Sequence, residues 1–318
     1  MSEDELRARN LRGLLQFCVE QTAREDNTSS NAEAMSEERR QWLSQVIGSI
    51  GNQVEQMKQN VDIVKSFLNS GEEHETDEVI EAIDNLIDIV AQIDYANDFH
   101  KIGGFEILAP LISCNNSKLQ IKGCDLLAEI VQNNKYCQKA VVDYKLLPLL
   151  VSTLDTDPDE EVRIKALYAI SCLLRGNEDI QSLFESQFDG FSVLLRSIQQ
   201  SSTKLRIKTS FLLTSLCQQQ PRFKEALWKM GFVEQIIAIL HQPHNETHEF
   251  LLSALYALVS EHEPSRKECQ RSELKFESLL RSKLQQIKDR DECKEEIEYC
   301  EKLLLICFNN DTQIESER

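Results

Sequence analysis

A pair of histidines four residues apart is the first arrangement in this sequence that could hold a metal ion. His244 and His248 have the spacing that places two imidazoles on one helix face in zinc hydrolases. That chemistry also requires a glutamate directly after the first histidine, and Asn245 stands there instead. Pro243 precedes the pair and is typical of a loop. We therefore predict that this segment holds no metal.

Ten cysteines are the other residues with reactive side chains. Cys293, Cys300 and Cys307 recur every seven residues, so they lie along one helix face, too far apart along its axis to share one tetrahedral ion. Most of the others, such as Cys172, lie inside apolar helical patterns. We interpret the cysteines as buried, reduced thiols of the core.

Motifs for catalysis and nucleotide binding are missing from the sequence. It has no G-x-x-x-x-G-K-[ST] phosphate loop, no G-x-G-x-x-G turn, no Cys-x-x-Cys pair and no G-x-S-x-G elbow. The six histidines have no partnered nucleophile. We therefore predict a protein that is not an enzyme, has no catalytic residues and needs no cofactor.

The composition limits the possible partners. A formal net charge of -18 disfavours nucleic acid and anionic membranes, because both attract clustered lysine and arginine. The first residues form no signal peptide and no run of about 18 apolar residues occurs, so we expect a cytoplasmic location. Only ten glycines and six prolines punctuate the chain, which favours long helices with short connections.

An internal repeat then organises the chain. Leu119 to Lys122, Val162 to Lys165 and Leu205 to Lys208 are similar segments that follow one another at 43 residues. This period is typical of helical solenoids. Apolar residues after Val162 recur at helical spacing, which predicts an amphipathic helix at the end of each repeat. A fourth unit ends near Ala257, so we expect an all-α, right-handed helical solenoid of about four repeats.

Glycines precede the second apolar helix of most repeats. Gly103 with Gly104, then Gly190, then Gly231 stand there and permit a sharp turn between helices. The second repeat has Lys145 at this place.

The segments before and after the repeats have the features expected at the ends of a solenoid. Helices before residue 71 are expected to break near Gly48 and Gly51, and residues 71–100 are strongly acidic. Two charged amphipathic helices, 274–287 and 292–308, follow the repeats and should close the stack. We expect four parts: a flexible segment 1–34, N-terminal helices with an acidic cap 35–95, repeats 96–263, and capping helices with a tail 264–318.

The last helix of each repeat in a right-handed stack lies on the inner, concave surface. The helix from Val162 resembles the third helix of armadillo repeats, with Tyr168 and Cys172 at the two inward positions. The same register and the nearby basic residues give the predicted partner-binding surface: Asp125, Glu129, Arg163, Lys165, Tyr168, Cys172, Arg175, Lys208, Phe211, Ser215 and Tyr256. This mixture of aromatic, acidic and basic residues suits a folded protein partner.

Peptide-clamping armadillo proteins carry a Trp–Asn ladder on this surface, and these positions carry none. An armadillo scaffold or peptide-binding adaptor with another partner is the alternative. An interpretation of Tyr168 and Phe211 as core residues also stays open at this point.

Several segments together resemble the armadillo-repeat nucleotide exchange factors of the 70-kDa heat-shock chaperone. They are 35–43, 54–58, 162–175, 189–194 and 299–304. The resemblance implies a monomeric co-chaperone that holds one lobe of the ATPase domain of a cytosolic chaperone in its concave face and promotes ADP release. It also suggests a modulating or inhibitory effect on refolding.

An apolar segment near the N-terminus resembles the peptides that such chaperones bind. Its apolar residues are Leu11, Leu14, Leu15 and Phe17. We hypothesise that it mimics substrate. The alternative is a weak amphipathic helix without this role.

Overall fold

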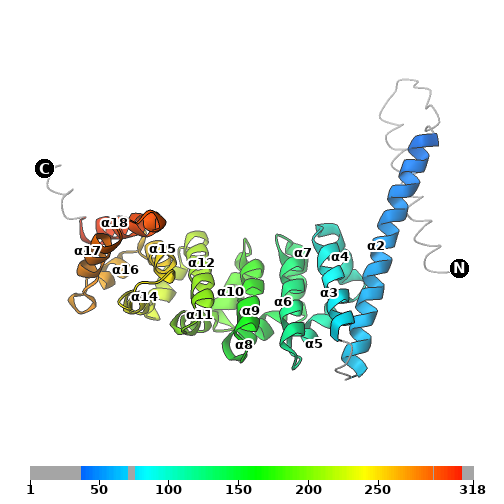
Figure 1. The fold of residues 1–318 in the computed structure, drawn as a ribbon, viewed down its shortest axis with the longest axis horizontal. Helices are drawn as coiled ribbons and strands as arrows, with labels where there is room; N and C mark the ends of the chain where they lie inside the picture. The colour runs from blue at the N-terminus through cyan, green and yellow to red at the C-terminus, as the bar shows by residue number, and fades with distance from the viewer. Residues whose placement is uncertain (1–36, 71–75, 289, 310–318) are drawn as a thin grey trace. The chain divides into compact units, whose positions relative to one another are not determined.

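The computed structural model describes residues 37–70, 76–288 and 290–309, and it describes side chains from residue 53 onward. Every regular element in these residues is a helix (Figure 1). The chain divides into two compact units, Met1–Gly51 and Asn52–Arg318. The helices before the second repeat are α2 (Glu37–Ser70), α3 (Thr76–Val90), α4 (Ile93–Lys101), the 3-10 helix η1 (Gly104–Ile107), α5 (Leu108–Ile112) and α6 (Ser117–Val131).

The helices that follow continue one pattern of three per repeat. They are α7 (Lys135–Asp143), α8 (Leu146–Thr156), α9 (Glu160–Leu174), α10 (Glu178–Ser186), α11 (Gly190–Gln199), α12 (Thr203–Gln219), α13 (Phe223–Lys229), α14 (Phe232–Leu240) and α15 (Thr247–Val259). The last are α16 (Glu263–Cys269), η2 (Ser272–Leu274), α17 (Phe276–Ile287), η3 (Asp291–Cys293) and α18 (Lys294–Phe308). The all-α solenoid predicted from the repeat is confirmed.

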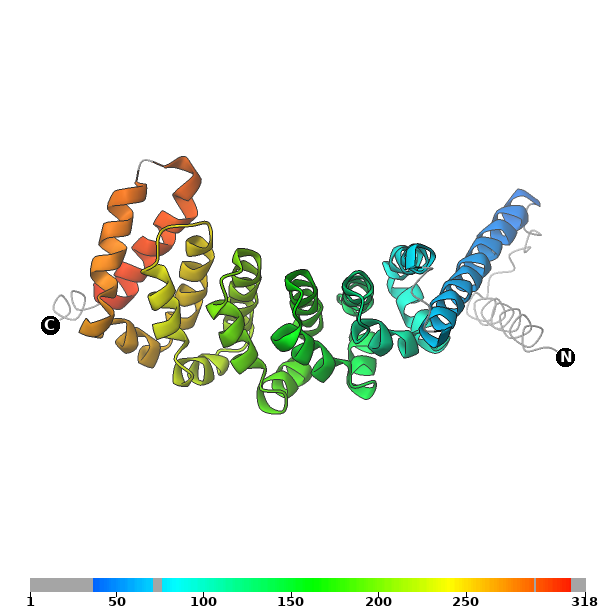
Figure 2. The ribbon, with the colours of Figure 1, turned by 60° about the horizontal axis from the view of Figure 1, so that its bottom comes forward.

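The third helices of successive repeats stack on one another in chain order. Helix α3 contacts α6, α6 contacts α9, α9 contacts α12, α12 contacts α15, and α15 contacts α18. Within the second unit, α6, α9 and α12 lie on the inner side of the bend that the repeats form (Figure 2). The segment that we expected to cap the stack, α16 to α18, thus repeats the same three-helix arrangement as a fifth unit.

Asparagine, aspartate and serine side chains begin the third helices at the repeat period. Asn116, Asp159 and Ser202 are the N-caps of α6, α9 and α12, and each stands 43 residues after the previous one. Each side chain accepts a hydrogen bond from a backbone N–H of the first turn. Because these N–H groups have no partner inside the helix, the caps stabilise the start of each helix.

The turn before each second helix contains one residue with positive φ. Its φ is 82° at Gly103, 55° at Lys145, 51° at Asp189 and 83° at Gly231. Our placement of the third turn at Gly190 was therefore one residue late. Gly190 is needed for another reason, because a Cβ there would lie 2.4 Å from the Phe184 ring.

Side-chain amides connect neighbouring repeats through the first helices. Gln138 donates to the Val131 carbonyl at 3.0 Å, and Gln181, 43 residues later, donates to the Leu174 carbonyl at 2.8 Å. Asn177 donates to Gln138 Oε1 at 2.9 Å and so joins the two repeats. Both glutamines are buried. We call these residues the amide ladder: Asn134, Gln138, Asn177 and Gln181.

One hydrophobic core runs through the stack from Met57 to Cys307. Of the nine cysteines in the described residues, only Cys114 is partly exposed, and all nine are free thiols. Burial raises the pKa of Cys124 and Cys217 to about 12, so these thiols stay protonated near neutral pH. The interpretation of the cysteines as buried core residues is confirmed for the eight other than Cys114.

Helix α2 corrects one expectation. We expected a break near Gly48 and Gly51, but α2 runs without interruption from Glu37 to Ser70. Each glycine costs a helix about 1 kcal/mol relative to alanine, which a helix of 34 residues can absorb.

Candidate protein-binding surface

Two exposed aromatic side chains distinguish the third helices of the middle repeats. Tyr168 on α9 is 38% exposed and Phe211 on α12 is 58% exposed. Their interpretation as core residues is therefore wrong. A large ring in water forgoes the free energy that burial would supply, so a row of such rings is typical of a surface that another protein covers.

Basic side chains border these rings. The Nζ of Lys208 lies 5.9 Å from the centroid of the Tyr168 ring, within the range of a cation–π interaction. Arg175 is the exposed C-cap residue of α9. Together with neighbouring side chains these residues line a shallow recess formed by Tyr168, Ser171, Arg175, Lys208, Phe211, Leu212 and Ser215.

The aromatic row continues toward the C-terminus through residues that the sequence analysis missed. Phe250 packs on Phe211, with 4.9 Å between ring centroids. Lys302 of α18 lies over the rings of Tyr256 and Tyr299, at 5.5 Å and 5.4 Å. Tyr299 and Lys302 lie in a segment that carried the family resemblance, but nothing in the sequence places them beside Tyr256. We call this set of exposed and partly exposed residues the inner surface: Tyr168, Arg175, Lys208, Phe211, Tyr256 and Lys302.

Asp125 and Lys165 form an ion pair with each other. Lys165 Nζ is 2.8 Å from both carboxylate oxygens of Asp125, across α9 and α6. Lys204 pairs with Glu161 in the next repeat at 2.7 Å. These ion pairs connect adjacent third helices, and the partly exposed Asp125–Lys165 pair contributes up to about 1 kcal/mol.

Arg163 points to a different part of its repeat. It donates to the carbonyl oxygens of Asp157 and Pro158 at 2.6 Å and 3.2 Å, in the loop before α9. It stands five positions before Tyr168, about 140° around the helix. Arg206, 43 residues later and buried, donates in the same way to the carbonyls of Ile198 and Gln200. The arginine at this position of the repeat therefore stabilises the connection before the third helix.

The other predicted surface residues are less exposed. Cys172 is only 3% exposed, so it offers a partner little contact area. Glu129 and Ser215 are partly buried, and Ser215 Oγ accepts a hydrogen bond from Gln219 at 2.7 Å. The apolar N-terminal set, Leu11, Leu14, Leu15 and Phe17, lies outside the described residues.

The described helices give no indication of a membrane span. None of them combines the length and the apolar character that crossing a lipid bilayer requires.

Comparisons with known proteins agree with this architecture. Residues 11–99 match the family model described as nucleotide exchange factor Fes1, and residues 95–226 match the SIL1/FES1/HPBP1 C-terminal domain. A designed armadillo repeat protein of known structure superposes with a TM-score of 0.61 at 20% identity, covering 79% of this chain and 99% of that one. This last likeness concerns the fold alone.

Two curated relatives match over most of their length, and a third matches over about a third of its length. Hsp70-binding protein 1 of Mus musculus is 37% identical over 98% of this chain and 89% of its own length. The human protein of that name is 36% identical over 95% of this chain and 86% of its own. Hsp70 nucleotide exchange factor FES1 of Mycosarcoma maydis is 34% identical over 44% of this chain and 36% of its own. The repeats, the inner surface and these matches together show that the chain belongs to the family of Fes1 and Hsp70-binding protein 1.

Proposed function

We propose that this protein is a co-chaperone that binds an Hsp70 chaperone and accelerates the release of its nucleotide. The names of its relatives support this activity, because they describe Hsp70 binding and Hsp70 nucleotide exchange. The hydrolysis of ATP then belongs to the chaperone, and this chain acts only by binding, as a non-enzymatic partner.

The inner surface is the proposed docking site for the chaperone's ATPase domain. The exposed Phe211 and Tyr168 rings carry this proposal, because aromatic side chains near the centre of an interface supply much of its affinity. Lys208 and Arg175 beside them add specificity for acidic groups of the partner. The recess between these four residues would receive one side chain of the partner.

Exchange follows from a difference in affinity between two states of the chaperone. The factor must bind the open, nucleotide-poor ATPase domain more tightly than the closed, ADP-bound form, since only such a difference shifts a conformational equilibrium. ADP must then weaken the complex by the same factor. A tenfold acceleration requires about 1.4 kcal/mol of selective stabilisation of the opened state.

The activity is tested with a fluorescent ADP analogue bound to a purified cytosolic Hsp70. We expect the full chain to accelerate release, with a rate that saturates as its concentration rises. Unchanged release in the presence of a folded, helical protein would contradict the proposal and favour an armadillo scaffold with another partner.

The docking site is tested with the double variant Tyr168→Ala with Arg175→Glu. We expect weaker Hsp70 binding and slower exchange with an unchanged helical spectrum, because both side chains are exposed. The matched control is Tyr136→Ala with Lys139→Glu, which changes an exposed tyrosine and an exposed base on α7. Equal affinity of the two folded double variants would exclude this docking site.

The N-terminal segment has a separate proposed role in clearing substrate. We propose that the apolar residues between Leu11 and Phe17 compete with peptide bound to the chaperone. Deletion of residues 1–34 should then leave ADP release intact and slow the displacement of a bound model peptide. Displacement at the full-length rate would refute the substrate-mimic role.

A further inference from the structure

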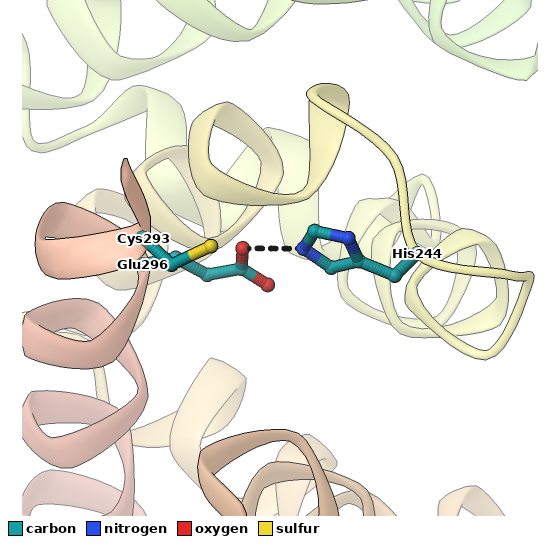
Figure 3. Close-up of side chains that lie close together, drawn as sticks. All are labelled: His244, Cys293 and Glu296. Atoms are coloured by element: carbon teal, nitrogen blue, oxygen red, sulfur yellow. Dashed lines mark hydrogen bonds and ion pairs between the residues drawn. The ribbon is translucent and has the colours of Figure 1, made fainter. Parts of the chain in front are cut away.

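Three side chains from two segments meet at the C-terminal end of the repeats, away from the inner surface residues of α9 and α12. His244 comes from the loop between α14 and α15, Cys293 ends η3, and Glu296 lies in the first turn of α18 (Figure 3). One ligand atom of each lies within 4.8 Å of the other two. His244 Nε2 is 2.8 Å from Glu296 Oε2.

The two residues from the α18 side are buried, although their side chains are polar or reactive. Cys293 is 5% exposed and Glu296 is 3% exposed. Glu296 Oε1 is buried without a hydrogen-bond donor, and the nearest ammonium, Lys283 Nζ, is 3.7 Å away. This separation exceeds hydrogen-bond length. A buried carboxylate oxygen that accepts no hydrogen bond lowers the stability of the folded state, unless a further cation or donor interacts with it.

The surroundings of the three residues add negative charge. Glu249 and Glu295 lie close enough that burial, together with the charges of Glu295 and Glu296, raises the pKa of Glu249. Glu292 also acts on Cys293 as a nearby negative charge. Lys283 beside Glu296 and Arg290 near Cys293 offset part of this excess. A cation at the three-residue cluster would reduce the remaining repulsion.

Although the histidine spacing alone predicted no metal here, we propose that His244, Cys293 and Glu296 form a zinc site that joins the fourth and fifth repeats. Thiolate, imidazole and carboxylate are the ligands that Zn²⁺ takes in proteins, whereas Ca²⁺ and Mg²⁺ prefer oxygen alone. Three protein ligands leave a fourth tetrahedral position for water.

Formation of the site requires only small movements. At metal–ligand bonds of about 2.0–2.3 Å, two ligand atoms of a tetrahedral ion lie about 3.3–3.8 Å apart. His244 Nε2 and Glu296 Oε2, now 2.8 Å apart, therefore separate slightly, and any wider pair of ligand atoms moves closer. His244 is exposed and lies on a loop, so it can make this movement. The Cys293 thiol gives its proton to solvent on binding, and the His244–Glu296 hydrogen bond is replaced by two bonds to the ion.

The location indicates what bound zinc would do. His244 precedes Cys293 by 49 residues, so the ion would close a long loop and hold the α14–α15 connection against the start of α18. A ligand that binds only the folded state raises the midpoint of thermal unfolding. The proposal is independent of Hsp70 binding, because it concerns the stability of the last two repeats.

The experiment uses the full chain after removal of metal by a chelator. Zn²⁺ is titrated in competition with a chromophoric chelator, and Co²⁺ is used as a spectroscopic substitute that reports thiolate coordination. We expect one Zn²⁺ per chain, a thiolate-to-cobalt absorption band, and a rise in the thermal midpoint with added Zn²⁺.

Single variants assign the site. His244→Ala and Cys293→Ser should each weaken Zn²⁺ binding by about 100-fold or more, and Cys293→Ser should remove the cobalt band. His241→Ala is the matched control, because it removes another histidine from the same region and should leave binding unchanged. His244→Ala changes an exposed loop residue and keeps the test valid even where Cys293→Ser fails to fold.

Two outcomes would overturn the proposal. One is the absence of stoichiometric Zn²⁺ binding to the wild-type chain, which would leave the three residues as a buried hydrogen-bonded group. The other is binding of equal strength in the wild type and His244→Ala, which would place the ion elsewhere in the chain.

Discussion

The amide ladder and the inner surface lie in the same repeats but differ in what completes their interactions. Gln138 and Gln181 occupy equivalent positions and donate to equivalent carbonyls, so the repeats themselves supply acceptors for both amide donors, although Gln181 Oε1 is buried without a donor. Tyr168 and Phe211 also occupy equivalent positions, yet their rings remain exposed. The difference indicates that the ladder stabilises the stack and that the inner surface is available to a partner.

Ion pairs between third helices form an intermediate case. Lys165 and Asp125 pair across repeats beside the inner surface, but both side chains keep substantial contact with water. Water screens such pairs, so their contribution to stability is much smaller than that of the buried amides. The amide ladder, the inner surface and the ion pairs therefore predict mutational effects of three different sizes.

The largest expected effect is the loss of stability on replacement of a ladder amide. Gln138→Ala removes the donor to Val131, a 3.4 Å contact to the Cys172 carbonyl, and the acceptor of Asn177. We expect the free energy of unfolding to fall by about 3 kcal/mol, because buried polar groups lose their partners. Urea unfolding followed by circular dichroism measures this.

The control for that variant is Gln218→Ala, an exposed glutamine on α12. It should change the free energy of unfolding by less than about 0.5 kcal/mol. Similar losses in both variants would contradict a special role for the ladder.

A smaller effect, on binding instead of stability, is expected from Phe211→Ala. Loss of this ring and its contact with Phe250 should weaken Hsp70 binding by about 30-fold, or about 2 kcal/mol, as for the central residues of an interface. Stability should change by less than about 1 kcal/mol, because the ring is 58% exposed. Titration calorimetry and thermal unfolding on the same preparation separate the two quantities.

Tyr136→Ala serves as the comparison, since it removes an exposed ring from α7, outside the inner surface. An affinity loss equal to that of Phe211→Ala would show that exposed aromatics in general, and not the inner surface, determine binding.

The smallest expected effect concerns Lys165 and Asp125. A double-mutant cycle with Lys165→Ala and Asp125→Ala should give a coupling free energy of about 0.5 kcal/mol. Raising the salt concentration should reduce it, because the pair is partly exposed. A coupling above about 2 kcal/mol that persists in high salt would place this pair with the buried contacts.

Much of the fold could be predicted because each repeat carries its own local signals. The 43-residue period, the helical spacing of apolar residues and the N-cap residues all act within one repeat, so they are visible in the sequence. The fifth unit was missed as a repeat because its segment lacks the Val162-like motif, although Lys275 has the positive φ of the other turns. The third turn was predicted at Gly190, but its positive φ lies at Asp189. Glycine is required at position 190 because a Cβ there would collide with the neighbouring Phe184 ring.

The candidate surface was predicted only in part. Third-helix register identified Tyr168, Phe211 and Tyr256, because equivalent positions of a solenoid face the same side. It also selected Arg163 and Cys172, which the packing turns toward a loop and into the core. Spacing along one helix gives direction, but the neighbouring repeat decides exposure.

The sequence by itself determined the helices, their period, the excess of acidic charge and the kinship with Fes1-type proteins, because these depend on residues close together in the chain. Only the tertiary structure decided which distant side chains meet. His244 and Cys293 are 49 residues apart, and Tyr256 lies under Lys302 across a further repeat. The physical reason is that contacts between repeats depend on the packing and rotation of whole helices, to which many side chains contribute at once.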